Sequence, residues 1–153
     1  MRFVLVAVLT LAFGSAATAG QNFECGEARV EIAVSSRGEL PLPAEDGRST
    51  VTVSLGRDAR MLSYIGGIDF IGGHCVKAAD GRPLVVFQAY CGGSGCKDRD
   101  NWGIVDPHSL QVLVAPNDSN RIETQKVLGE APTPPKEMLS VEREVSMMHK
   151  DAP

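Results

Sequence analysis

The sequence is poor in aromatic residues and in clustered positive charge. Phe, Trp and Tyr make up 5% of its 153 residues, and Trp102 is the only tryptophan. Lys and Arg total 15 against 19 Asp and Glu, a net charge of −4, and they are scattered along the chain. Nucleic acids and anionic lipids are bound through grouped positive charge, so the composition argues against both kinds of partner.

The sequence also lacks an apolar run long enough to cross a bilayer. The run from Phe3 to Phe13 has 11 residues, whereas a membrane-spanning helix needs about 20. Arg2 precedes this run and Ala17-Thr18-Ala19 follow it, which is the pattern of a secretory signal peptide. We therefore expect residues 1–19 to be removed on export and the mature protein to be periplasmic or secreted.

Cysteine is sparse, and all four cysteines follow the expected cleavage site. In an exported protein four cysteines indicate two disulfides, for which three pairings exist. Glycines and one serine separate Cys91 from Cys96, so this short segment closes into a loop without strain. We therefore expect Cys91 to pair with Cys96, and Cys25 to pair with Cys75.

Alternation of apolar with polar or small residues dominates the middle of the chain. It is clearest over residues 29–35 and 50–55, and a period of two is typical of half-buried strands. The stretch 36–49, which is rich in Pro, Gly and acidic residues, is expected to be a loop. Further strands are expected over 84–90, 102–105 and 110–115.

Glycine pairs interrupt the apolar residues between these strands. Gly66-Gly67 and Gly72-Gly73 predict tight turns that separate short strands over 61–65, 68–71 and 74–78. Asp80-Gly81 predicts a further hairpin turn.

The period changes near the C-terminus. Asp118 or Ser119 is expected to cap a short helix that ends at Gly129. A Pro-rich linker begins at Ala131, and beyond it apolar residues at heptad spacing predict either a second helix or a disordered tail. We therefore expect a signal peptide (1–19), a disulfide-bonded domain (20–130), and a linker with tail (131–153). The fold class is mainly β, either a small antiparallel sandwich or a curved sheet with one short helix.

The most distinctive feature is the segment that joins the expected strands 84–90 and 102–105. Its tip has no bulky side chain, charged residues follow the second cysteine, and a disulfide would close it. Such a loop has little conformational entropy to lose on docking, so it is our candidate for a partner-binding site. The residues expected to contact the partner are Gly93, Ser94, Gly95, Lys97, Asp98, Asp100 and Asn101.

No reactive motif withstands inspection. Ser94 resembles the nucleophile of a serine hydrolase, but Cys96 stands where that motif needs glycine. A disulfide would consume the thiols of Cys91 and Cys96, which removes them as nucleophiles. The run from Asp98 departs from a calcium-binding loop at Trp102 and Ser109. We therefore expect neither catalysis nor a metal or cofactor.

Trp102 begins an expected strand, and we expect it in the core rather than at an interface. Compartment, size and the closed loop together favour a binding protein that acts as an inhibitor or immunity protein against a secreted toxin or cell-wall-degrading enzyme. Two alternatives stay open: an envelope structural or assembly component, and an enzyme whose site is dispersed along the sequence.

Overall fold

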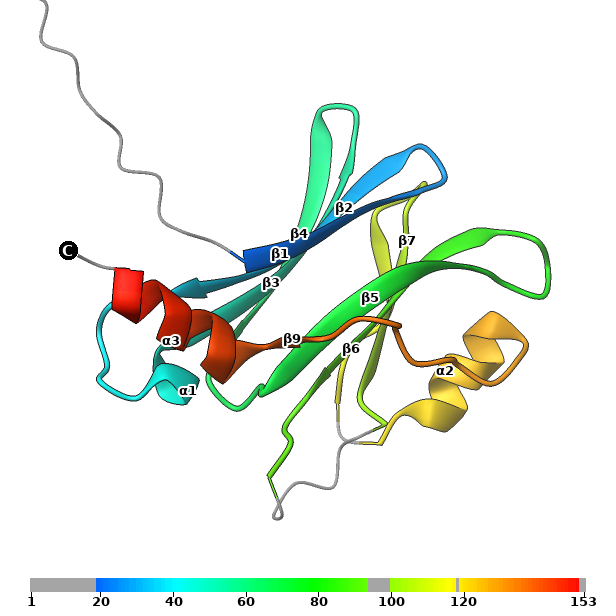
Figure 1. Ribbon diagram of the computed structural model, residues 1–153. Helices are drawn as coiled ribbons and strands as arrows, with labels where there is room; N and C mark the ends of the chain where they lie inside the picture. Colours follow the sequence, from blue (N-terminus) through cyan, green and yellow to red (C-terminus); the bar gives the residue numbers. More distant parts are fainter. Residues whose placement is uncertain (1–18, 94–99, 118, 152–153) are drawn as a thin grey trace, which may run out of the picture.

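The computed structural model describes residues 19–93, 100–117 and 119–151 (Figure 1). Within these ranges it holds two antiparallel sheets, of four and five strands, and three short helices. The sheets pack face to face, which confirms the expected mainly β fold and its sandwich form. In the described part of the chain, no helix is long and apolar enough to cross a membrane.

The first sheet, sheet A, is a meander of hairpins in the order β1-β2-β3-β4. Two-residue turns join β1 to β2 and β3 to β4, and each turn begins with a glycine at φ 61°. Glycine is favoured at this place because other residues are strained at positive φ. The strands are β1 (Ala19–Cys25), β2 (Ala28–Ser36), β3 (Gly47–Leu55) and β4 (Asp58–Ile65).

The second sheet, sheet B, has the strand order β8-β7-β6-β5-β9. Pro83 opens β6 and lies opposite Lys77 at the end of β5, where a missing N–H costs least. The strands are β5 (Phe70–Lys77), β6 (Pro83–Tyr90), β7 (Trp102–Asp106), β8 (Gln111–Val114) and β9 (Leu139–Ser140).

The main core lies between the two sheets. Fully buried side chains from β2 and β3, such as Ile32 and Val51, meet Phe87 and Val105 of sheet B there. A second cluster lies on the outer face of sheet B, where Leu128 contributes to the cover over Trp102. Trp102 is 1% exposed, so the expectation that it belongs to the core is confirmed.

Three helices complete the fold: α1 (Pro43–Asp46), α2 (Arg121–Leu128) and α3 (Val141–Asp151). The sequence left open whether the tail after the Pro-rich linker is a helix or disordered, and in the structure it forms the helix α3. Val141 and Val145 of α3 are buried in the main core, so this helix packs with the sheets and closes one end of the sandwich. The expected loop 36–49 is shorter than predicted, because α1 and the first residues of β3 occupy its second half.

Two local predictions were wrong. Gly72-Gly73 is not a turn but lies inside the continuous strand β5. A Cβ atom at Gly72 would collide with the Glu137 carbonyl, and one at Gly73 would lie 2.7 Å from Ile32 Cδ1, so both glycines allow close packing. Gly66-Gly67, by contrast, is a turn with φ values of 66° and 69°.

The second wrong prediction is the start of helix α2. The N-cap position is Asn120, and no side chain caps the helix there. Ser119 has a φ of 55° and precedes the cap, while Asp118 lies outside the described residues. The end of the helix is as predicted, because Gly129 adopts the left-handed conformation with φ 78°.

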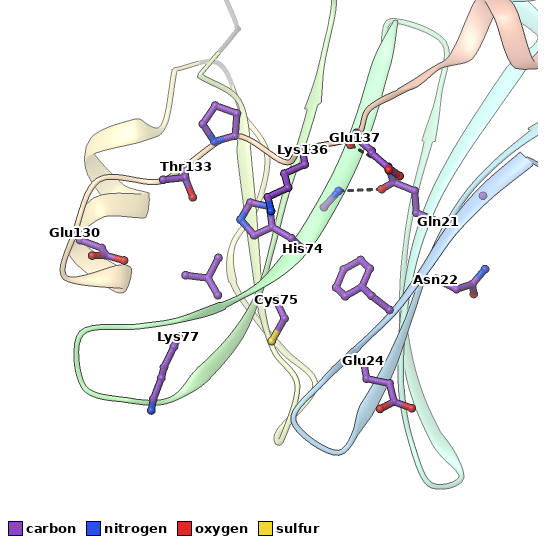
Figure 2. Close-up of a pocket in the computed structure, with 15 residues that line it drawn as sticks. Gln21, Asn22, Glu24, His74, Cys75, Lys77, Glu130, Thr133, Lys136 and Glu137 are labelled. Atoms are coloured by element: carbon purple, nitrogen blue, oxygen red, sulfur yellow. Dashed lines mark hydrogen bonds between the residues drawn. The ribbon is translucent and has the colours of Figure 1, made fainter.

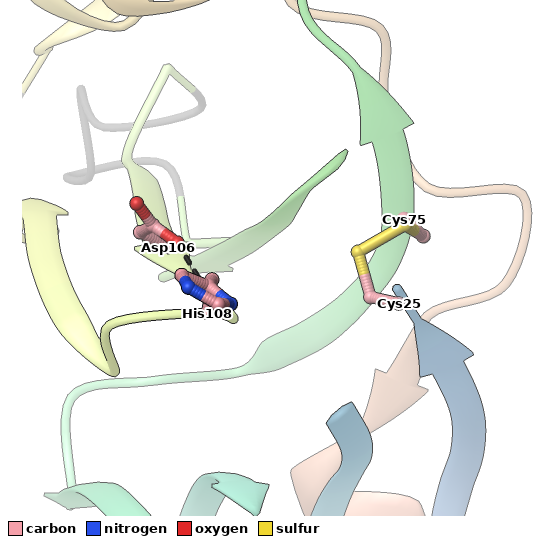
Figure 3. Close-up of a disulfide and its surroundings, with 4 residues drawn as sticks. All are labelled: Cys25, Cys75, Asp106 and His108. Atoms are coloured by element: carbon pink, nitrogen blue, oxygen red, sulfur yellow. Dashed lines mark hydrogen bonds between the residues drawn. A yellow bond between two sulfur atoms is a disulfide. The ribbon is translucent and has the colours of Figure 1, made fainter. Parts of the chain in front are cut away.

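A disulfide joins Cys25 at the end of β1 to Cys75 in β5, with 5.1 Å between the two Cα atoms (Figure 3). This confirms the predicted pair and ties sheet A to sheet B. Cys96 lies outside the described residues, so its pairing with Cys91 stays a prediction.

Candidate functional site

The predicted partner-binding loop connects β6 to β7 at one end of sheet B. The structure describes its two flanks, residues 91–93 and 100–101. Of the residues expected to contact a partner, Ser94, Gly95, Lys97 and Asp98 lie outside the described residues. The flanks show how the loop is mounted on the sandwich.

The first flank is held by the residues that precede β5. The Gly92 N–H donates to Asp69 Oδ2 at 2.7 Å, and the Asp69 N–H donates to the Tyr90 carbonyl at 3.0 Å. The rings of Phe70 and Tyr90 lie 5.4 Å apart. A Cβ atom at Gly92 would lie 2.5 Å from the Phe70 ring, so the chain leaves β6 through a gap that only glycine fits.

The second flank is held by the chain that leads into α2. The Asp100 carbonyl accepts the Asn120 N–H at 3.1 Å, and the Asp100 carboxylate forms an ion pair with Arg121 at 3.2 Å. Asn101 is 6% exposed, and its Nδ2 donates to the Ala89 carbonyl at 2.7 Å. The structure thus places Asn101 inside the base of the loop, whereas Gly93 is exposed and Asp100 partly exposed.

Asn120 is the main clamp of this flank. Its Oδ1 accepts the Trp102 N–H at 2.8 Å, and its Nδ2 donates to the carbonyls of Trp102 at 2.6 Å and Ala115 at 3.0 Å. The side chain therefore replaces a missing strand partner at the start of β7. Sequence reasoning missed Asn120, because nothing distinguishes it there from an ordinary polar residue before a helix.

A groove of about 980 Å³ lies at the corner where β1 meets β5 (Figure 2). Gln21 of β1 bridges its walls: its Oε1 accepts the Gly73 N–H at 3.2 Å, and its Nε2 donates to the Glu137 carbonyl at 2.9 Å. The exposed residue Cys75 also lines it. The charged side chains among its lining residues are of both signs: Glu24, Lys77, Glu130, Lys136 and Glu137.

The groove does not gather a reactive set of groups. Burial lowers the pKa of His74, which keeps its imidazole neutral at neutral pH. Opposite charges lie along the walls without converging on one point. Its chemistry is that of a mixed polar surface, and sequence reasoning gave no sign of it.

A smaller hollow of about 450 Å³ lies among the β1–β2, β5–β6 and β7–β8 turns. Pro83, Pro107 and Leu55 contribute apolar walls, and His108 lines it. The His108 backbone N–H donates to Asp106 Oδ1 at 2.9 Å (Figure 3), which is the ordinary turn chemistry expected from the sequence.

Ser36, Asp46 and His149 come together from three different elements. Ser36 Oγ donates to Asp46 Oδ2 at 2.5 Å and lies 3.0 Å from His149 Nε2, while His149 Nε2 lies 3.3 Å from the same Asp46 oxygen. In a catalytic triad the imidazole bridges the acid and the hydroxyl with its two different nitrogens. Here one nitrogen faces both partners, so the cluster has a structural geometry.

Asp46 is the centre of this cluster and is fully buried. The Ser36 hydroxyl is the largest cause that lowers its pKa below the ordinary value of 3.8, and backbone N–H groups of Leu40, Gly38 and Glu39 add to the effect against the opposing effect of burial. The carboxylate thus remains charged and organises the loop that follows β2.

Metal ligands do not gather in the described ranges, where no three His, Cys, Asp or Glu side chains are placed to hold an ion. Asp98, the first position of the calcium-like pattern, lies outside those ranges. Comparison with family models, with curated proteins and with solved structures finds no match to this chain.

Proposed function

We propose that the chain is an exported binding protein of the inhibitor or immunity type, which blocks a secreted toxin or a cell-wall-degrading enzyme with the loop between β6 and β7. An oxidising compartment outside the cytoplasm agrees with the disulfide between Cys25 and Cys75. The residues 1–19 are the proposed export signal. The periplasm is the destination that this proposal favours.

One observation carries the proposal: both flanks of the loop are fixed to the sandwich by inward-facing polar groups. Asp69 holds Gly92 on one side, and Asn120 holds the start of β7 on the other. When a partner docks on such a loop, the base of the loop loses little conformational entropy because it is already ordered. This small loss raises the affinity of binding. Hydrogen bonds of this kind stiffen a connection without adding any reactive group.

The structure gives less support to the two alternatives. An envelope-assembly component would bind its partners through an exposed apolar surface, for which the tail helix is the candidate, but Val141 and Val145 of this helix are buried in the core. An enzyme with a dispersed site would bring Asp, His and Ser side chains together in a pocket. Ser36, Asp46 and His149 do converge. None of the three lines the groove beside β5 or the smaller hollow.

The test begins with affinity capture from a native envelope extract, followed by mass spectrometry of the retained proteins. The same capture is then repeated with two variants, Ser94→Trp in the loop and His108→Trp in the exposed β7–β8 turn at the opposite end of β7. We expect Ser94→Trp to lose the partner with an unchanged melting temperature, and His108→Trp to retain it.

The captured protein is then assayed for activity with and without the chain. Inhibition that Ser94→Trp abolishes and His108→Trp preserves would support the proposal. Equal capture by all three proteins, or a captured protein whose activity does not change, would rule out inhibition through this loop.

A further inference from the structure

Strand β4 forms one open edge of sheet A. It pairs with β3 on one side, and no strand in the described ranges pairs with its other side. The side chains on its solvent-facing side are strongly exposed, including Met61 at 63% and Ile65 at 55%. An exposed strand edge offers a row of unpaired backbone donors and acceptors to any chain that can align with it.

The register shows which backbone groups face outward. The two-residue turn after Leu55 makes Leu55 and Asp58 a hydrogen-bonded pair, and every second pair along the two strands is bonded in the same way. The Gly66 N–H, which donates to the Gly47 carbonyl at 3.4 Å, fits this alternation. Even-numbered residues of β4 therefore bond to β3. The outward backbone groups belong to Ala59, Met61, Ser63 and Ile65.

Two of the devices that usually protect a strand edge, proline and a β-bulge, are missing from this one. Residues 59–65 contain no proline, and their pairing with β3 has no bulge. Arg60 is their only charged residue, and its Nε donates to the Leu110 carbonyl at 3.1 Å, which turns the side chain toward sheet B. The edge is therefore open to a partner.

We propose that this edge is an interface between two copies of the chain, which pair antiparallel through β4 about an axis at Leu62. Sheet A would then continue into the second copy as one sheet. In this register Met61 lies opposite Ser63 of the partner subunit, and Ile65 lies opposite Ala59 of the partner subunit. Every outward backbone group meets another outward group.

The side chains favour a second copy over an unrelated strand because the edge complements itself. On the solvent-facing side of the strand, the two large apolar residues, Met61 and Ile65, each meet a small one, and on the core-facing side Leu62 meets its own copy. Arg60 meets Tyr64 of the partner subunit, so no like charges are brought together. A shift of the register by two residues in one direction would place Ile65 opposite Arg57. A shift by one residue would place outward backbone groups of one copy opposite residues of the other copy whose backbone groups already bond to β3.

A single strand edge buries less than the roughly 800 Å² per partner of a standard interface. The dimer should therefore dissociate on dilution. The association is independent of the loop between β6 and β7, because β4 lies in the other sheet and forms its own edge.

The test is sedimentation of the mature protein over a wide concentration range. We expect a monomer–dimer equilibrium, and at least tenfold weaker association for Met61→Lys, which sets two lysines close together across the axis. Thr52→Lys is the matched control, since Thr52 is the cross-strand neighbour of Met61 but lies one strand inside the edge. It should dimerise like the unmodified protein, and circular dichroism should show both variants folded.

The register is tested by spin labels on single cysteines at Ser63→Cys and Ala59→Cys. Pairing about Leu62 places the two copies of position 63 about 8 Å apart and the two copies of position 59 about 20 Å apart, from the strand rise and spacing. A monomer at every concentration, equal effects of the two lysine variants, or the reverse order of label distances would overturn the proposal.

Discussion

Asp46 shows how one residue organises a whole connection. Its buried carboxylate accepts the N–H groups of Gly38, Glu39 and Leu40 and the hydroxyl of Ser36. These donors come from the end of β2 and the loop after it, while His149 approaches from α3. A charge without water around it is stable only when its lone pairs are satisfied in this way.

We predict that Asp46→Asn lowers the free energy of unfolding by about 3 kcal/mol, because an amide group offers fewer acceptor sites and points donors at donors. Urea unfolding of the variant measures this loss. Glu39→Gln is the control, since the Glu39 carboxylate is 67% exposed and forms an ion pair with Arg37 at the surface. Its change should stay within about 0.5 kcal/mol.

The same carboxylate predicts a dependence of stability on pH. The hydrogen bonds lower the pKa of Asp46 below 3.8, so in acid the unfolded chain binds this proton before the folded chain does. The contribution of Asp46 is complete above its unfolded pKa and is lost as the pH falls toward the folded pKa. The urea midpoint, measured from pH 6 downward, should fall more steeply for the natural chain than for Asp46→Asn. Parallel curves would contradict this assignment.

At the scale of elements, the chain between β8 and α2 determines how β7 begins. Asn120 supplies three hydrogen bonds there, and its own carbonyl accepts the Thr124 N–H and hydroxyl. Helix α2, the start of β7 and the second flank of the candidate loop are thus all bonded to one residue, through its carbonyl, its side chain and its backbone N–H respectively. A disturbance at Asn120 should reach all three.

We predict that Asn120→Ala destabilises the fold by about 2 kcal/mol and speeds amide exchange at Trp102, whose buried N–H loses its acceptor. Native-state hydrogen exchange measures the second effect. Arg121→Ala is the matched control, because its ion pair with Asp100 is about half exposed and contributes at most about 1 kcal/mol. Equal exchange at Trp102 in both variants would show that Asn120 is not the clamp.

The sequence predicted those elements whose own pattern matches their surroundings. Strands β2 and β3 alternate because one face is buried, and α2 ends at the glycine that its geometry requires. Strand β1 was not predicted, because Phe23 is its only large apolar residue and its side chains lie at a sheet edge. Gly72-Gly73 was misread, because the close approach of the Pro-rich linker is a property of the folded chain.

The candidate site was less predictable than the fold. The sequence indicated where the loop lies and that glycines form it, but its anchors Asp69 and Asn120 are distant in sequence. The groove beside β5 depends on three segments that meet only after folding. Local patterns carry no information on such meetings.

For the whole molecule, the covalent link between the sheets matters most. The disulfide joins residues separated by 50 positions and holds β1 beside β5, which share no ladder in the described ranges. We predict that the double variant Cys25→Ser/Cys75→Ser loses about 4 kcal/mol, because the unfolded chain regains the entropy of a long open loop. Thermal unfolding measures this loss, and a variant as stable as the natural chain would contradict it.

The two halves of this cystine differ in their surroundings: Cys25 is 1% exposed, whereas Cys75 is exposed on the groove. A small thiol arriving from solvent must attack the Cys75 sulfur. The departing group is then the Cys25 thiolate, an anion released into apolar packing, which burial disfavours. Reducing agents should accordingly cleave this bond slowly while the protein is folded, and the crosslink should outlast brief reducing conditions.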